Sequence, residues 1–237
     1  MIKFFRKIRQ TSLKEGKIIN YLKYAIGEIL LVVIGILIAL QINNWNDWRK
    51  DRIQEKILLQ DLAENLDLNI QTLNLDIKFL QQVNLSSKII LDALDSRVPY
   101  NDSLNLQFHL ARVTKQDLSL SNIAYQALKD RGIGIILNKE LANEIKKLHE
   151  VTIPHLLSDN SQVNQYYAPF DNHVVQNFIY DSEKGLTPNN YEALFTDQFY
   201  ISWTRAYMEG RKYLMKNDLE MIGEYERVLQ LVKNELN

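Results

Sequence analysis

The chain of 237 residues contains no cysteine. This excludes disulfide bonds, thiol catalysis, thiolate-bound zinc and iron–sulfur clusters. Glycine and proline are also scarce, with eight and four residues. Because turn-forming residues are so few, long helices are favoured over a sheet-rich fold. We therefore predict an all-α protein.

The chain as a whole has no large excess of positive or negative charge, since 28 basic and 29 acidic residues give a net charge of −1. The charges are nevertheless unevenly placed. Residues 1–23 hold seven basic side chains against the single acidic Glu15. Because Glu28 lies in residues 24–42, residues 43–237 hold the remaining 21 basic and 27 acidic side chains. A surface of that sign does not attract nucleic acid. We predict no nucleic-acid partner.

One apolar run, residues 24–42, stands out in this charge-rich chain. At about 1.5 Å per residue it spans about 28 Å, which matches the hydrocarbon core of a bilayer. It is longer than the apolar core of a signal peptide, and no small-x-small cleavage pattern follows it. We predict an uncleaved transmembrane helix whose first partner is the lipid bilayer.

The flanks of this run predict its orientation. Basic tails stay in the cytoplasm, so residues 1–23 should form a cytoplasmic tail and residues 43–237 an extracytoplasmic domain. Trp45 and Trp48 follow the run among Asn and Asp residues. Their rings suit an interfacial belt at the lipid–water boundary.

Apolar residues recur every three or four positions beyond the belt, which predicts amphipathic helices. The expected helices cover residues 49–94, 103–113, 121–131, 139–151, 154–180 with an interruption at Pro169, and 197–236. Residues 181–190 are expected to form a loop, with Thr187 and Pro188 starting a helix. The predicted fold is an antiparallel helical bundle in which the first and last helices are long.

Glu28 is an unusual residue for a membrane span, because a carboxylate there is costly. At 100° per residue it shares one helix face with Ala25, Val32, Gly35 and Ala39. Gly35 and Ala39 form a small-xxx-small pattern that permits close helix approach. We predict that this face contacts another helix. Two alternatives are a proton relay at Glu28, and a Glu28 side chain that reaches water or a lysine of the tail.

The remaining residues offer little chemistry. No two of the four histidines lie four residues apart, so we predict no metal site, with the pair His149 and His155, near Asp159, as the alternative. The aromatic residues Phe195, Phe199, Trp203 and Tyr207 are predicted to be bundle core rather than a ligand pocket. No motif for nucleophilic catalysis or phosphate binding is present, so we predict neither an enzyme nor a bound cofactor.

Several segments carry a family resemblance. They read MIKFFRKIRQ at residues 1–10, YAIGEI at 24–29, ALQINNWN at 39–46 and SNIAYQALK at 121–129. The chain resembles an uncharacterised family of single-span inner-membrane proteins of Bacteroidota, a domain of unknown function, most strongly over residues 1–50. The resemblance implies a bacterial inner-membrane protein with a periplasmic helical domain, and it implies no activity.

Together these features predict a membrane-anchored structural or regulatory interaction protein. It should self-associate or dock a membrane-protein partner through the face that includes Glu28, Gly35 and Ala39. One alternative is a periplasmic ligand-sensing bundle that acts through a partner. Another is a subunit of an ion-coupled membrane complex that uses Glu28.

Overall fold

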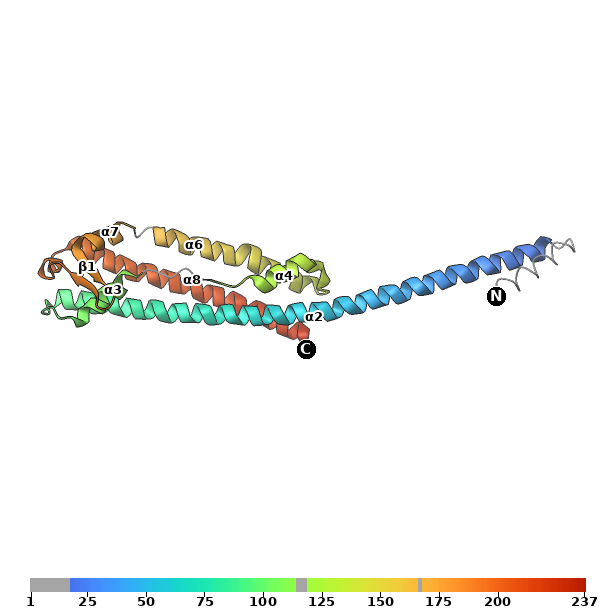
Figure 1. Ribbon diagram of the computed structural model, residues 1–237, viewed down its shortest axis with the longest axis horizontal. Coiled ribbons are helices and arrows are strands. Elements are labelled where there is room, and N and C mark those ends of the chain that lie inside the picture. Colours follow the sequence, from blue (N-terminus) through green and yellow to red (C-terminus); the bar gives the residue numbers. More distant parts are fainter. Residues whose placement is uncertain (1–17, 114–118, 166–167) are drawn as a thin grey trace. The chain divides into compact units, whose positions relative to one another are not determined.

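The computed structural model describes residues 18–113, 119–165 and 168–237 (Figure 1). Residues 1–17 of the predicted tail lie outside the described residues. The chain divides into two compact units, Met1–Glu55 and Lys56–Asn237. The prediction of a mostly helical chain, with a long apolar helix near its start and a long helix at its end, is confirmed.

Helix α2 (Ile18–Asp95) is 78 residues long and contains the apolar run. It is the one helix among the described residues that is long and apolar enough to cross a membrane, judged by length and composition. The helix ends where Arg97 takes a positive φ of 50°. The amides of Arg97 and Val98 donate back to the carbonyls of Leu94 and Ala93, at 3.1 and 2.9 Å. Such a left-handed turn satisfies the last carbonyls of a helix.

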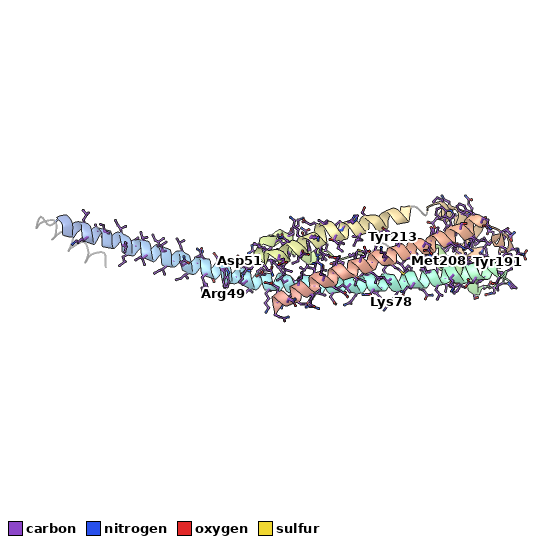
Figure 2. The ribbon with its side chains drawn as sticks, turned by 180° about the vertical axis from the view of Figure 1, so that it is seen from behind. Arg49, Asp51, Lys78, Tyr191, Met208 and Tyr213 are labelled. Atoms are coloured by element: carbon purple, nitrogen blue, oxygen red, sulfur yellow. The ribbon has the colours of Figure 1, made fainter. Side chains whose placement is uncertain are left out.

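Helix α8 (Gln198–Leu236) lies beside the second part of α2 in the larger unit (Figure 1). Figure 2 shows Met208 on α8, whose backbone carbonyl accepts a hydrogen bond from Asn84 of α2 at 3.3 Å. Both helices bury residues at alternating steps of three and four, the spacing of a coiled-coil seam. The seam of α2 comprises Leu59, Leu62, Leu66, Asn69, Leu73, Asp76, Leu80, Val83, Ser87, Ile90 and Leu94. The seam of α8 comprises Tyr200, Thr204, Tyr207, Arg211, Leu214, Asp218, Met221, Tyr225, Val228 and Val232.

Shorter elements cover this helix pair in the larger unit. They are α3 (Ser103–Arg112), α4 (Ile123–Arg131), the 3₁₀ turn η1 (Ile133–Ile135), α5 (Lys139–Lys147), the π-helix η2 (Leu148–Thr152), α6 (Ile153–Gln165), α7 (Ala168–Asn177) and the 3₁₀ turn η3 (Glu192–Phe195). The predicted helix start at Asn138 is confirmed, because its side-chain oxygen accepts a hydrogen bond from the Leu141 amide at 3.1 Å. Such a cap satisfies an amide that the first helical turn leaves free.

The prediction of an entirely helical chain is wrong at residues 178–188. Strands β1 (Phe178–Asp181) and β2 (Gly185–Pro188) form an antiparallel hairpin there, in place of the expected helix end, loop and helix start. The Asp181 carboxylate accepts hydrogen bonds from the Glu183 and Lys184 amides at 2.8 and 3.0 Å, which closes the turn. Phe178 is buried and contacts Phe108 of α3, with ring centroids 5.3 Å apart. The hairpin therefore depends on packing against a distant segment.

Gly185 fixes how closely the hairpin approaches α3. Its φ is 96°, and a Cβ atom added to it would lie 2.7 Å from the Asn105 carbonyl oxygen. We expect Gly185→Ala to lower the free energy of unfolding by about 2 kcal/mol, because it adds both backbone strain and a clash. Urea unfolding of the full chain would measure the loss. Gly134→Ala is the control, since no atom lies within 4 Å of its added Cβ. Equal stability of the two variants would contradict the prediction.

The predicted aromatic core of the last helix is only partly correct. Tyr207 is fully buried, but Phe199 is 41% exposed. The buried neighbour of Phe199 is Tyr200, which is 2% exposed. The seam of α8 runs through Tyr200, Thr204 and Tyr207, so four-residue steps back from Tyr207 through Trp203 to Phe199 leave it.

Candidate functional site

The predicted interaction face lies on the first part of α2. Ala25, Glu28, Val32, Gly35 and Ala39 are all helical, as the prediction of a shared face requires. No atom lies within 4 Å of the position that a Cβ of Gly35 would occupy. The backbone at Gly35 is therefore accessible to a second helix.

The apolar side chains around this face are covered by no other part of the described chain. The most apolar window of α2 is 0% buried, and Leu31 is 70% exposed. Figure 2 shows side chains standing outward along this part of the helix. A run of exposed leucine, isoleucine and valine of this length could cross a bilayer.

The predicted interfacial belt follows directly on the same helix. Trp45 and Trp48 are 63% and 53% exposed. Polar pairs lie beside them, since Asn43 donates to Asp47 at 3.1 Å and Lys50 lies 3.4 Å from the same carboxylate. The structure thus places exposed indole rings where the apolar run gives way to charge.

A second candidate site lies in the larger unit around His149, which the π-helix η2 carries. The imidazole stacks on the ring of Tyr125 with centroids 4.4 Å apart and planes at 5°. The ring of Tyr225 meets it edge-on at 6.5 Å. Burial lowers the pKa of His149 to about 4, so the ring is neutral at neutral pH. Its Nε2 atom is buried and has no hydrogen-bond partner.

Polar contacts hold the stacking partner of His149 in place. The Tyr125 hydroxyl donates to Glu150 Oε1 at 2.9 Å, and Lys129 Nζ donates to the same oxygen at 3.0 Å. The hydrogen bonds from Lys129 and Tyr125 hold the pKa of Glu150 below its ordinary value. Burial, together with Glu150, raises the pKa of Tyr125 to about 12. The ring that faces His149 is thus anchored through its hydroxyl.

A cavity of about 130 Å³ adjoins His149. Its walls are formed by Leu120, Ser121, Asn122, His149, Ile153, Pro154, Leu157 and Tyr225. Asn69 of α2 fixes one wall, because it donates to the Ser121 carbonyl and accepts from the Ser121 amide, both at 2.8 Å. Asn65 donates to the Ser121 hydroxyl at 2.7 Å. The backbone at this wall is therefore tied to the long helix.

The alternative metal pair gains no third ligand among the side chains that the structure describes. Among the residues that the structure describes, no group of three or more His, Asp or Glu side chains could hold a metal ion. His155 instead lines a different hollow, of about 570 Å³, together with Val151, Thr152, Leu156, Glu220, Gly223 and Glu224. His149 and His155 thus belong to two separate surroundings.

Arg211 is a buried charge that the sequence analysis did not single out. The side chain sits in the seam of α8 and is 2% exposed. Its guanidinium donates to the carbonyls of Ala111 and Val113 at the end of α3, at 2.5 and 2.7 Å. It also donates to Ser87 Oγ at 2.8 Å and Asn84 Oδ1 at 3.2 Å, both on α2. One side chain thereby joins three helices, a structural role.

His173 and Asp197 form a side-chain contact that sequence spacing did not reveal. His173 Nε2 lies 2.8 Å from Asp197 Oδ2, and the other oxygen of Asp197 accepts the Tyr200 amide at 2.9 Å. Asp197 therefore caps α8 and contacts α7 at once. The His173 ring also lies against Phe199, with centroids 4.8 Å apart. Phe199 thus contacts α7 while it remains 41% exposed.

A family model described as "Family of unknown function (DUF6090)" matches residues 28–102, less than half of the chain. The matched range includes Glu28, Gly35, both belt tryptophans and most of α2, whereas segment 121–129 lies outside it. No curated protein and no solved structure matches this chain. In residues 28–102 the chain is thus similar to a family whose function is unknown.

Proposed function

We propose that this chain is a membrane-anchored interaction protein that associates with a second copy of itself. The observation that carries the proposal is that no residue in the most apolar window of α2 is buried. Lipid would cover Leu, Ile and Val on most sides of the helix. The side with Gly35 and Ala39 would pack against the same side of a second copy.

The proposed placement is the bacterial inner membrane, with the tail in the cytoplasm and residues 43–237 in the periplasm. The seven basic side chains of residues 1–23 support this orientation. The exposed Trp45 and Trp48 support a lipid–water boundary at the other end of the run. The resemblance of residues 1–50 to a single-span family agrees with both.

Self-association through this face follows from its chemistry. Small residues four apart let two backbones approach closely, and dispersion contacts then replace contacts with lipid. Glu28 lies on the same face, and a carboxyl group in a membrane helix is more stable beside protein than beside lipid tails. A two-fold axis would bring the same five residues together from both copies: Ala25, Glu28, Val32, Gly35 and Ala39.

Replacing the small residue tests this proposal. In the full chain reconstituted in lipid nanodiscs, Gly35→Leu is expected to weaken dimerisation about tenfold, because a side chain would hold the helices apart. Gly27→Leu is the matched control. Gly27 lies 100° away from Glu28 around the helix, and nothing lies within 4 Å of the position that its Cβ would occupy. Crosslinking at graded protein-to-lipid ratios measures the association. A wild-type chain that stays monomeric at every ratio would refute the proposal.

A Glu28→Gln variant separates the assembly proposal from the ion-coupling alternative. Glutamine keeps the size and a hydrogen-bonding group but cannot titrate. Assembly that persists in Glu28→Gln without loss of a proton-dependent phenotype favours packing, whereas loss of such a phenotype with intact assembly favours ion coupling.

A further inference from the structure

The hollow of about 570 Å³ that His155 lines lies between two helices of the larger unit, and the self-association proposal does not use it. One wall comes from η2 and the start of α6, and the other comes from one turn of α8. Helices α6 and α8 run side by side (Figure 1), and Asn217 donates a buried hydrogen bond to Asn160 at 3.0 Å. One helical turn from this bond, Leu156 of α6 and Glu220 of α8 line the hollow.

The wall from α8 carries two carboxylates. Glu220, Gly223 and Glu224 are three and four residues apart, so they lie on the same side of the helix. The side chains of Glu220 and Glu224 are 51% and 38% exposed, so a molecule in the hollow can reach their carboxylates. Like charges four residues apart on a helix repel each other. A cation bound between them would remove this repulsion.

The basic side chains near these carboxylates do not neutralise them fully. Lys216 lies 3.7 Å from Glu220, and Arg227 lies 3.0 Å from Glu224. Arg227 lies even closer, at 2.7 Å, to Glu144 of α5. Two basic groups thus face three carboxylates, which leaves one negative charge. Among the described residues that line the hollow itself there is no lysine or arginine.

Gly223 forms the floor between the two glutamates. It lies in the interior of α8, where glycine is less favourable than alanine. No atom lies within 4 Å of the position that a Cβ of Gly223 would occupy, so packing within the described chain does not require a glycine. The absent side chain opens the backbone of α8 to the close approach of another molecule.

The opposite wall is mainly apolar. Val151 is 61% exposed, and Leu156 lies beside it on the same wall. Val151 belongs to the π-helix η2, which separates the buried residues Leu148 and Ile153 by five positions. Such π-helical turns occur frequently at functional sites. An apolar wall that faces two carboxylates suits a molecule with an apolar part and a positive charge.

The dimensions of the hollow favour a small molecule over a protein segment. Binding sites for small molecules have volumes of about 300–1,000 Å³, and this hollow has about 570 Å³. The part of α8 that lines it, residues 220–224, is about 6 Å long. A partner helix would need a groove several turns long.

We propose that this hollow binds a small amphipathic cation, an apolar ring or chain that carries one ammonium group. The ammonium group would lie between Glu220 and Glu224. The apolar part would cover the backbone at Gly223 and contact Val151 and Leu156. Cation binding would be a second function of the larger unit, independent of association through α2.

2-Phenylethylamine is a suitable probe, because it joins a flat apolar ring to an ammonium group that is charged at neutral pH. The experiment titrates it into the full chain in nanodiscs of zwitterionic lipid, with ¹³C-labelled valine methyl groups. The Val151 signals are assigned by their loss in Val151→Ile. The expected result is a saturable shift of the Val151 signals, with a dissociation constant of about 1 mM.

A neutral analogue tests whether the charge matters. 2-Phenylethanol has the same ring and chain but no charge, so it should bind at least about tenfold more weakly, since it loses two exposed ion pairs. If the Val151 signals do not respond to 2-phenylethylamine, or respond equally to both compounds, the proposal is wrong.

Matched variants test the position of the site. The double variant Glu220→Gln with Glu224→Gln should weaken 2-phenylethylamine binding about tenfold. The control is Glu209→Gln with Glu226→Gln, which removes the same charge from exposed positions of α8 outside the hollow and should bind like the wild type. An equal loss of affinity in both double variants would show attraction to the overall charge and would refute the site.

A variant that fills the hollow completes the test. Gly223→Leu replaces a glycine with a better helix former and should abolish the saturable response, because its side chain would occupy the floor of the hollow. Circular dichroism checks that the variant keeps its helices. An unchanged affinity in Gly223→Leu would place the bound probe elsewhere and contradict the proposal. Dimerisation through Gly35 is measured separately, so either proposal can fail without the other.

Discussion

Arg211→Ala is expected to lower the free energy of unfolding by about 3–5 kcal/mol. The substitution removes five hydrogen bonds in one step. The carbonyls of Ala111 and Val113, together with Ser87 and Asn84, would lose their donor inside the bundle. A cavity the size of the guanidinium would remain.

The geometry of the guanidinium explains why lysine should not replace it. Its planar fork reaches two carbonyls of α3 on one side and two side chains of α2 on the other, whereas an ammonium group offers a single point of contact. The ring of Tyr207 lies 5.3 Å from the guanidinium carbon and adds a cation–π contact. The positive charge also lies at the carboxyl end of α3, where the helix dipole favours it. Arg211→Lys should therefore fall between wild type and Arg211→Ala.

Urea unfolding of the full chain, followed by circular dichroism, measures this effect. Arg205→Ala is the matched control, because Arg205 is on the same helix, its side chain is 60% exposed, and it lies 3.7 Å from Asp95. Exposed pairs of this kind contribute at most about 1 kcal/mol. A loss in Arg211→Ala no larger than that in Arg205→Ala would show that Arg211 does not hold the three helices together.

The long helices could be predicted because their signals are local and repeated. Steps of three and four through Leu59, Leu62 and Leu66 indicate a helix wherever they occur. Asn138 is a strong cap residue, and the structure uses it as one. These features depend on neighbours within a few residues along the chain.

The hairpin and Arg211 depend on distant partners instead. Strands of four residues carry almost no local pattern, and Phe178 is held by rings on α3 and α8. A charged residue among buried positions is not expected from apolar spacing. Arg211 nevertheless lies four residues after Tyr207 and three before Leu214, and this spacing could have indicated that it is buried. Neither α3 nor its carbonyls could be positioned from the sequence.

The two candidate sites differ in the same way. The face with Glu28 and Gly35 follows from the helical repeat alone, so the sequence predicts it and only a partner can test it. The site at His149 depends on one extra residue in η2, which shifts the phase of the helix. The spacing of the histidines carries no sign of that shift, and this is why the sequence indicated an ordinary histidine there.

Stability of the larger unit is expected to fall by about 3 kcal/mol as the pH is lowered from 7 to 4 because of His149. An unfolded histidine binds a proton below about pH 6.5. The folded protein holds the pKa of His149 at about 4 through burial. Between these values the unfolded state binds the proton and the folded state does not. Acid therefore favours unfolding, and the stability is fully present only above about pH 6.5.

The other groups around His149 do not account for the loss of stability expected between about pH 6.5 and pH 4. Glu150 has a lowered pKa, so its contribution is lost only below the ordinary range of a glutamate. Tyr125 and Tyr225 have their pKa raised to about 12 by burial and do not titrate in acid. Lys129 and Lys146 lie 3.0 and 3.9 Å from the Glu150 carboxylate.

His149→Phe isolates the effect, because phenylalanine keeps a ring against Tyr125 but binds no proton. The wild-type chain should lose stability steeply between pH 6.5 and about 4, and His149→Phe should show a nearly flat profile there. His155→Phe is the control, since His155 is exposed, and it should follow the wild type. A wild-type profile that His149→Phe reproduces would mean that the folded bundle binds a proton at His149 as readily as the unfolded chain does, and it would contradict the prediction.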